Sequence, residues 1–316
     1  LESPGFSSLD DRVKFVTSLA KQYFTSSDSL ITLGISPEET VLWPNEETAI
    51  TQLSLARDLS AHVFWHCNAL GHEGKNARDV DTLRKMGLLG PDMVLVHMNF
   101  TDPDEWQMVA DYGAAVSFTP DTELQMGMSW PSTVVARQYG ITQGYGADIT
   151  SNNSGDMFMP LRFALQVARC QMNEKHNGNL YDGVPITCKE ALAWGTIDGA
   201  KALGLDHMVG SLTPGKQADI VMLRTNTLSM TGWDRSNAAG TVLLQASVQD
   251  VDTVMVAGNI VKRNGRLLAD TKHACQLVQA ATDRVAGIAS DNGKFYVSPE
   301  ETYERMSQTL VDSNAT

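Results

Sequence analysis

Five short apolar segments that alternate with helix-like segments limit most strongly how this chain folds. The apolar segments span residues 30–35, 61–66, 93–97, 114–119 and 141–148. Helices with apolar residues at helical spacing are expected at residues 10–24, 46–59, 77–86, 102–113 and 131–139. Strands that recur about every 20 to 32 residues, each followed by a helix, are typical of βα units in a parallel sheet or barrel. The sequence therefore predicts an α/β protein in which these five strands are parallel.

The pattern changes after residue 150. Two helices are expected at residues 156–174 and 187–202, the second opened by a capping box from Thr187 to Glu190. Short strands and a last helix are expected at residues 218–223, 253–256, 259–261 and 270–288. Asn264 and Gly265 have the composition of a hairpin turn. We expect three parts: a partial (β/α) barrel over residues 1–205, a β-sandwich segment over 206–268, and a C-terminal helix with a polar tail over 269–316.

Charge and composition narrow the class of partner. The net charge is −13, and no Lys/Arg-rich face offsets it, which argues against a nucleic-acid partner. No apolar run approaches the roughly 20 residues that cross a bilayer, and residues 1–10 lack the basic start and apolar centre of a secretory signal. The four cysteines are scattered without a CxxC pair, which suits a reducing compartment. We expect a cytoplasmic protein.

Three of the predicted strands end on residues that bind metal ions. His66, His97 and Asp148 stand at the carboxyl ends of the second, third and fifth strands. In a parallel sheet or barrel, residues at these ends point into the mouth where chemistry is done. Imidazole and carboxylate are ligands of zinc and iron. His62 lies on the same face of its strand as His66 but about 13 Å away, too far for one ion, so we expect a structural role for it.

Residues after the fourth and fifth strands are candidates for contact with a substrate. Glu123, Gln125 and Met126 follow the fourth strand, and Asn152 follows Asp148. Methionines in this region, with Trp130, form an adaptable apolar wall suited to a flat aromatic ring. The alternative for the first three is a loop packed on the rim of the barrel, and the alternative for Asn152 is a plain turn.

Four segments carry a resemblance to a known family. They are the strand and helix around His66; residues 94–100 with 114–126; residues 144–158, Gly-Tyr-Gly-Ala-Asp-Ile-Thr-Ser-Asn-Asn-Ser-Gly-Asp-Met-Phe; and residues 210–223, Gly-Ser-Leu-Thr-Pro-Gly-Lys-Gln-Ala-Asp-Ile-Val-Met-Leu. In order and spacing they resemble the metal-dependent amidohydrolase superfamily, most closely its cytosine-deaminase-like and triazine-hydrolase-like branch. The resemblance implies that the five strands are the fourth to eighth of a (β/α)8 TIM-type barrel, accompanied by part of a small β-sandwich.

The resemblance also implies roles for the three strand-end residues. His66 corresponds to a metal ligand, and His97 to a histidine that binds a second metal or a substrate oxygen. Asp148 corresponds to the aspartate that ligates the metal and takes the proton from the attacking water. The implied cofactor is one divalent ion, zinc in preference to iron. Such an ion lowers the pKa of bound water, and a carboxylate beside it accepts the proton as hydroxide attacks.

The sequence departs from the family pattern at three places. The His-x-His pair of the family's first strand is absent, as are the first three strands, and Ala69 stands where many deaminases have a catalytic glutamate. Residues 120–126, Pro-Asp-Thr-Glu-Leu-Gln-Met, replace the family's Pro-x-Ser-Asn after the seventh barrel strand. Five strands leave open barrel edges, so we expect an N-terminal segment or a second copy of the chain to cover them. The leading hypothesis is a metal-dependent hydrolase that cleaves a C–N or similar bond in a small cyclic or aromatic nitrogen compound. The alternative is a truncated, metal-free relative with a binding, cyclisation or isomerisation role, in which His97 and Asp148 act as an acid and base.

Overall fold

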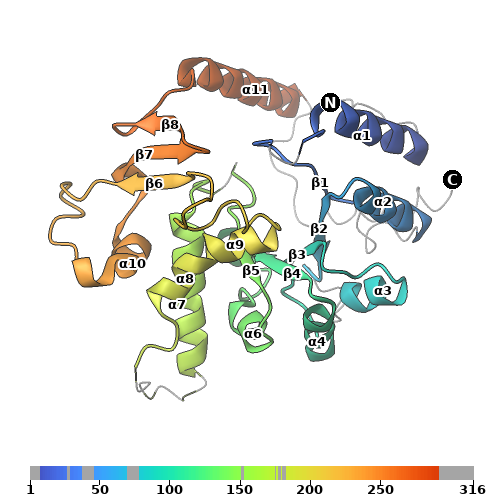
Figure 1. Ribbon diagram of the computed structural model, residues 1–316, viewed down its shortest axis with the longest axis horizontal. Helices are drawn as coiled ribbons and strands as arrows, with labels where there is room; N and C mark the ends of the chain where they lie inside the picture. Colours follow the sequence, from blue (N-terminus) through green and yellow to red (C-terminus); the bar gives the residue numbers. More distant parts are fainter. Residues whose placement is uncertain are drawn as a thin grey trace.

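A five-stranded parallel sheet is the centre of the molecule (Figure 1). The computed structural model describes residues 8–26, 29–37, 46–69, 78–150, 153–174, 176, 179 and 183–291. The strands are β1 (Gly34–Ile35), β2 (His62–Cys67), β3 (Met93–His97), β4 (Ala115–Phe118) and β5 (Gln143–Tyr145). They are neighbours in space in the order in which they occur in the sequence, and every pairing is parallel. This confirms the predicted α/β fold with a parallel sheet; within the described ranges β1 and β5 are its two edges, so closure of a barrel stays a prediction.

Helices cover one face of this sheet, which we call the outer face (Figure 1). The helices of this half are α1 (Leu9–Tyr23), α2 (Glu46–Asp58), α3 (Asp79–Lys85), α4 (Pro103–Tyr112), α5 (Pro120–Gln125) and α6 (Thr133–Gln138). Alternate strand residues such as Trp65, Leu95 and Phe118 are buried in one core with side chains of α2, α3, α4 and α6. Each large apolar side chain buried in this way contributes roughly 1.5–3 kcal/mol. Trp65 faces away from His66, as its strand position predicts.

Local signals place the ends of these helices. Pro103 occupies the first turn of α4, and Gly113 ends the helix with φ 72°, the left-handed conformation that glycine adopts without steric cost. Helix α5 was not expected from the sequence, because six residues are too few to show an apolar period. It begins at Pro120, directly after β4, and so folds the chain back at the carboxyl end of that strand.

The helix predicted over residues 187–202 is two helices. Thr187 caps α8 (Cys188–Trp194) as predicted, because its side chain accepts a hydrogen bond from the Glu190 amide. The helix stops at Gly195, and Thr196 has φ −134° and ψ −100°, outside the helical region, before α9 (Ile197–Ala202) begins. This break turns α9 onto the sheet, where Ala202 packs with Val94 and Ala115 on the face opposite the outer helices, which we call the inner face. The capping signal was correct, but the helical period hid the break.

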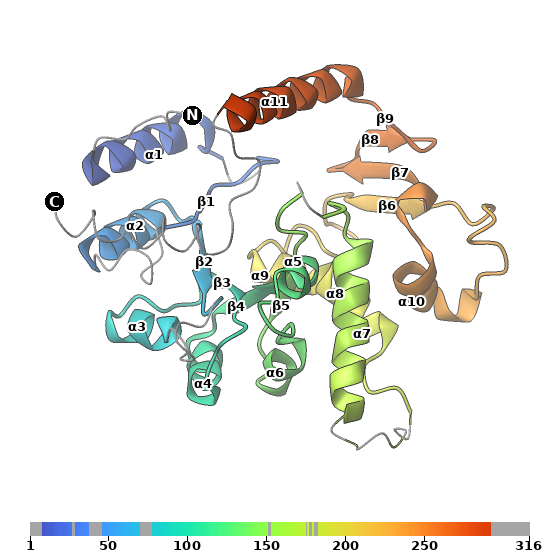
Figure 2. The ribbon, with the colours of Figure 1, turned by 180° about the vertical axis from the view of Figure 1, so that it is seen from behind.

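Helix α7 and a second sheet follow the parallel sheet in the chain. Helix α7 (Phe158–Glu174) packs against α5, α6 and α8 (Figure 2). The second sheet is antiparallel and consists of β6 (Ile220–Leu223), β7 (Val251–Val256), β8 (Asn259–Arg263) and β9 (Arg266–Leu267). Asn264 and Gly265 have φ 53° and 76°, the positive values of the expected hairpin turn between β8 and β9.

The last described element is helix α11 (Thr271–Asp291), close to the expected helix over residues 270–288. The predicted polar tail lies outside the described residues, and the division of the chain into three parts stays a prediction. Among the helices described, none has the length and apolar character needed to cross a membrane.

Candidate active site

The three predicted strand-end residues lie at one edge of the parallel sheet, its carboxyl edge. His66 is on β2, His97 ends β3, and Asp148 follows β5 by three residues. In the register of the sheet, His66 lies beside Val96 and Cys67 beside His97. Because parallel strands end at the same edge, the fold brings the loops that carry these residues to one rim.

The backbone at His97 turns its side chain toward His66. In an extended strand His97 would point the same way as its neighbour Cys67, which is buried among the outer-face residues. Instead His97 has φ 75° and Met98 has φ 57°. The two histidine rings are stacked, with centroids 5.3 Å apart and planes 12° from parallel. Left-handed conformations at residues other than glycine cost about 1–3 kcal/mol each and are concentrated at functional sites.

Neighbouring strands hold this strained turn in place. The Met98 amide donates to the Cys67 carbonyl at 3.0 Å, and the Phe100 amide donates to the Asn68 carbonyl at 2.9 Å. The Thr101 hydroxyl donates to the Met98 carbonyl at 2.9 Å. The two backbone bonds continue the pairing of β2 and β3 beyond the strands themselves, and the Thr101 bond closes the turn locally. The unfavourable conformation of His97 is therefore fixed by its surroundings.

Two oxygen atoms face the Nδ1 atom of His97. The Thr119 Oγ1 atom lies 3.1 Å from it, and the Glu123 Oε1 atom lies 3.4 Å from it. Glu123 Oε1 also accepts a hydrogen bond from the Thr119 amide at 2.9 Å. His97 is 5% exposed and Glu123 is fully buried. The structure places Glu123 behind His97 because α5 folds back on the strand end. Its contact with a substrate stays a prediction.

Asp148 is exposed and also has a left-handed backbone, with φ 58°. The loop that carries it is held by Asn153, whose side-chain amide donates to the Ala147 carbonyl at 3.1 Å and to the Thr122 hydroxyl at 2.7 Å. The substrate-binding candidate Asn152 lies outside the described residues. Asn153, the next residue, is the one that the structure shows in contact with this loop.

Gln125 and Met126 lie at the exposed end of α5. Met126 is 58% exposed and Trp130, further along the same loop, is 56% exposed. Their exposure fits the predicted apolar wall, while Met128 between them is buried. The contact of these side chains with a substrate stays a prediction.

The residues present fit a metal ion in part. His66 and His97 are two imidazoles side by side, and the oxygens behind His97 Nδ1 leave its Nε2 atom as the ligand atom. A carboxylate on the second nitrogen is the usual support of a metal-binding histidine. In the described ranges, however, no three His, Cys, Asp or Glu side chains come together as a metal cluster. The pair of His66 and His97 therefore fits a metal ion, whereas Asp148 does not form a three-residue group with the two histidines in the described ranges.

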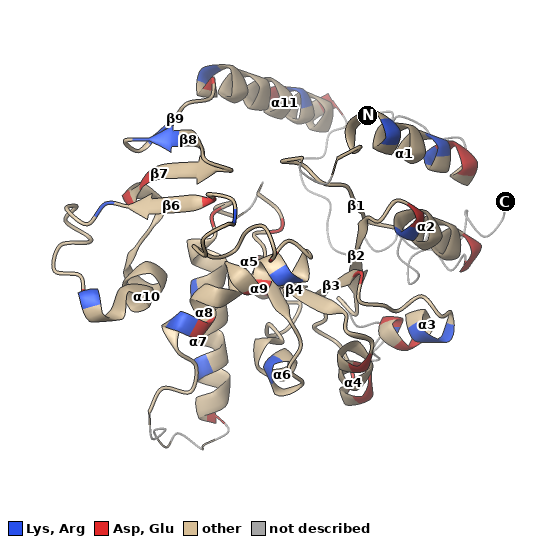
Figure 3. Cartoon of the chain, viewed as in Figure 1, with Lys and Arg blue, Asp and Glu red and all other residues tan. Residues whose placement is uncertain are grey.

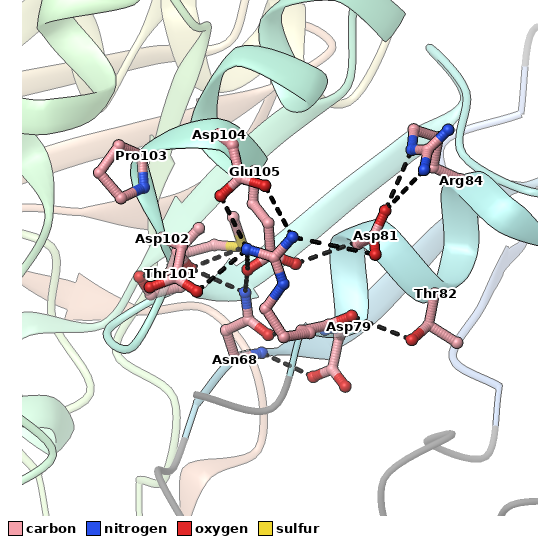
Figure 4. Close-up of polar contacts among 12 residues, drawn as sticks. Asn68, Asp79, Asp81, Thr82, Arg84, Thr101, Asp102, Pro103, Asp104 and Glu105 are labelled. Carbon is pink, nitrogen blue, oxygen red and sulfur yellow. Dashed lines mark hydrogen bonds and ion pairs between the residues drawn. The ribbon is translucent and has the colours of Figure 1, made fainter. Parts of the chain in front are cut away.

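A buried polar network lies directly behind the rim, between β2, α3 and α4 (Figure 4). The Asn68 amide donates to Asp79 at 2.8 Å, and the Asp79 amide donates to the Asn68 side-chain oxygen at 2.9 Å. Glu105 accepts from the Asn68 side chain at 3.0 Å and from the Asp81 amide at 3.0 Å. Sequence reasoning missed this network, although Asn68 stands only two residues after His66.

Ion pairs close the network toward solvent, where acidic residues of α4 lie next to the mixed charges around α3 (Figure 3). Arg78 binds Asp104 at 2.7 Å and Asp102 at 3.0 Å, and these hydrogen bonds raise the pKa of Arg78 and lower that of Asp104. Hydrogen bonds from Lys85 and Arg84 lower the pKa of Asp81 from its ordinary 3.8 to about 2. The loop between β2 and α3 is thus anchored at both of its described ends.

A cavity of about 990 Å³ lies on the inner face and is separate from the rim. Its lining is mostly apolar and includes Phe64, Val94, Ser117 and Gly144 of the parallel sheet with Ile220, Val254 and Met255 of the second sheet. His66, His97 and Asp148 are not part of it. We therefore interpret this cavity as a part of the inner face that no described residues cover, and not as the substrate site.

The sequence is similar to those of known enzymes. The sequence profile of the Amidohydrolase family matches residues 46–261. The chain is 30% identical over 210 residues to the 5'-deoxyadenosine deaminase of Methanothermobacter thermautotrophicus, covering 66% of this chain and 46% of that protein. It is 33% identical over 182 residues to the 5-methylthioadenosine/S-adenosylhomocysteine deaminase of Teredinibacter turnerae, covering 55% of this chain and 39% of that protein. The chain thus spans less than half the length of these curated relatives.

Solved structures give the same picture for the fold. An adenosine deaminase from Xanthomonas campestris with bound zinc has a TM-score of 0.78 at 22% identity, over 88% of this chain and 62% of that one. The atrazine chlorohydrolase TrzN from Arthrobacter aurescens TC1, complexed with zinc, has a TM-score of 0.72 at 22% identity, over 86% and 60%. At this level of identity the likeness concerns the fold alone.

Proposed function

The chain belongs to the amidohydrolase family, and on that premise we propose that its protein hydrolyses a C–N bond in a small cyclic or aromatic nitrogen compound. The observation that carries this proposal is the stacked pair of His66 and His97 at the carboxyl edge of the parallel sheet. The strained backbone at His97 and Asp148 supports it, because such conformations persist where function requires them. The curated relatives named as deaminases support the substrate class.

The side chains divide the chemistry among them. Asp148 is exposed at the rim and accepts a proton from the attacking water, which it then delivers to the departing nitrogen. His97 presents Nε2 to the mouth, since its Nδ1 faces Thr119 and Glu123. A divalent ion held by His66 and His97, zinc in preference to iron, supplies a water of lowered pKa when bound. Water is consumed, the C–N bond is replaced by a C–O bond, and ammonia or an amine is released.

The edges of the sheet belong to the same proposal. In the described part of the chain β1 and β5 each have one paired neighbour, and the inner face carries the large apolar cavity. Unpaired strand edges and uncovered apolar surface favour further pairing. We propose that strands of another segment of the protein, or a second copy of the chain, cover this face and supply the remaining ligands.

A second candidate function follows from the incomplete set of metal ligands in the described ranges. In the described ranges no third ligand joins the two histidines, and Ala69 occupies the place of the family's glutamate. In this case the rim is a binding site, or a site for cyclisation or isomerisation, in which His97 and Asp148 exchange protons without a hydrolytic water. Product analysis separates the two, because only hydrolysis releases ammonia or an amine.

The test is a release assay with the full protein. Amino-substituted purines, their nucleosides and aminotriazines are incubated with zinc-loaded and chelator-treated protein, and ammonia or amine is measured. We expect turnover of at least one class that falls about 10²-fold or more in His97→Asn and Asp148→Asn, the range of general acid–base contributions. His62→Asn is the matched control, because this histidine is on the same strand as His66 but faces the Asp92 carbonyl at 3.3 Å. Equal turnover by His97→Asn, Asp148→Asn and the control would contradict the assignment.

A further inference from the structure

The carboxylate of Glu123 is buried, and among the described residues one of its two oxygens has a hydrogen-bond partner. Its side chain is fully buried, and within the described ranges the Oε2 atom has no hydrogen-bond partner. The Oε1 atom accepts from the Thr119 amide and faces His97 Nδ1. A buried carboxylate without full compensation is unfavourable, so it needs a reason to be retained.

A role in capping α5 explains only part of this arrangement. Glu123 reaches back to the amide of Thr119, the residue that precedes the first turn of α5, and satisfies that donor. The cap does not explain why the same oxygen lies within reach of a histidine ring at the rim.

The donors and acceptors around His97 define its tautomer. An ionised carboxylate only accepts hydrogen bonds, whereas a threonine hydroxyl both donates and accepts. Contact of Nδ1 with both Glu123 Oε1 and Thr119 Oγ1 is favourable when Nδ1 carries the hydrogen. The neutral ring then has its lone pair on Nε2, the nitrogen available to the mouth.

The backbone makes such a support necessary. His97 has left the extended conformation, so strand pairing no longer dictates where its ring points. Stacking on His66 fixes the plane of the ring but not which nitrogen carries the hydrogen. Among the described residues, the contacts at Nδ1 are those that bear on this choice.

We propose that Glu123, together with Thr119, is a positioning residue that holds His97 in the Nδ1–H tautomer and presents the Nε2 lone pair to the rim. This role rests on the proposed function for its purpose, because a lone pair at the rim serves to bind a metal ion or to accept a proton. The tautomer itself is a property of the folded protein and is measured without substrate.

The experiment records two-bond nitrogen–proton correlations of histidine rings in the ¹⁵N-labelled full protein after chelation of metal, at a pH where the rings are neutral. His97→Asn identifies the His97 signals among the seven histidines of the chain. We expect wild-type His97 to show Nδ1 as the protonated nitrogen. Glu123→Leu should move it toward the Nε2–H form that free histidine favours, with the Nδ1 resonance shifting to that of a lone-pair nitrogen.

Two matched variants make the result specific. Glu123→Gln keeps a carbonyl oxygen toward Thr119 and His97, so it should retain the Nδ1–H tautomer. Gln125→Leu, an exposed change on the same helix, should leave all histidine signals unchanged. An Nε2–H tautomer in the wild type, or an unchanged tautomer in a folded Glu123→Leu, would overturn the proposal. The wild-type spectrum decides even if Glu123→Leu does not fold, and failure of the release assay would leave this result intact.

Discussion

Glu105 and Glu123 are two fully buried glutamates at the same edge of the sheet, and their surroundings differ. Both oxygens of Glu105 accept hydrogen bonds, one from the Asp81 amide and one from the Asn68 side chain, and Arg78 lies 4.0 Å away. Glu123 has a bonded oxygen and, among the described residues, an unpartnered one, next to a histidine in a left-handed conformation. A satisfied buried carboxylate acts in folding, whereas an incompletely satisfied one beside a strained residue indicates function.

The largest expected effect concerns stability on the Glu105 side of the comparison. Glu105→Leu removes the acceptor of two buried donors, so we expect the free energy of unfolding to fall by roughly 2–6 kcal/mol, about 1–3 kcal/mol for each donor. Glu123→Leu removes the acceptor of the Thr119 amide, whereas His97 Nδ1 keeps Thr119 Oγ1 as a partner, and the change also removes a poorly compensated charge. Its cost should therefore be at most about half as large. Urea denaturation of both variants tests the contrast, and an equal loss would remove the distinction between the two residues.

The second prediction concerns function on the Glu123 side. Carboxylates that support metal-binding histidines typically contribute 10–100-fold in metal affinity or activity. We expect Glu123→Leu to weaken zinc binding within about this range, and Glu123→Gln to weaken it less because an acceptor remains. Calorimetric zinc titration is the measurement. A Glu123→Leu protein with wild-type affinity would show that His97 needs no support from this residue.

A third prediction uses glycine at two left-handed positions, Asn68 with φ 47° and Asp148 with φ 58°. Asp148→Gly relieves backbone strain and loses no hydrogen bond described at that side chain, so it should exceed Asp148→Ala in stability by about 1–2 kcal/mol. Asn68→Gly relieves similar strain but loses the bonds to Glu105, Asp79 and Thr101, so it should be destabilising. Thermal unfolding measures both, and a gain at Asn68 would contradict the structural role of its network.

The smallest effect is a pH dependence in the Glu105 network. The pKa of Asp81 is lowered from 3.8 to about 2 by Lys85 and Arg84, at 2.7 Å each. A lowered folded-state pKa stabilises the protein fully above pH 3.8, and this contribution is lost as the pH falls toward 2. We expect Asp81→Asn to flatten the stability profile between these values. An identical pH profile in the variant would show that the ion pairs contribute nothing in solution.

The strands and the rim residues could be predicted because their signals are local. Apolar runs such as residues 93–97 are bounded by helix stops, and a histidine or aspartate at the end of such a run identifies itself by residue type. The helix break at Thr196 was missed, because residues 187–202 keep an apolar helical period on both sides of it. The residues on both sides of the break are helical. Only the tertiary contact of α9 with the sheet therefore reveals the break.

The roles of the buried polar residues could not be predicted, because they depend on contacts between distant segments. Asn68 meets Glu105 across 37 residues, and His97 meets Glu123 across 26. The orientation of His97 depends on its φ angle, which no apolar pattern records. Nothing in the six residues of α5 showed that this helix folds back and buries Glu123 behind His97. Residue types at the strand ends therefore indicated the rim, whereas the side chains that support the rim depend on the fold.

The measurement that tests the central claim most directly is native mass spectrometry of the full protein equilibrated with zinc. The same spectrum gives the number of chains and the number of bound ions. We predict bound zinc in the wild type, retained in the control His62→Asn and lost in His66→Asn and His97→Asn while each variant remains folded. Zinc uptake that is absent in the wild type, or unaffected by loss of either rim histidine, would contradict a metal-dependent site at His66 and His97.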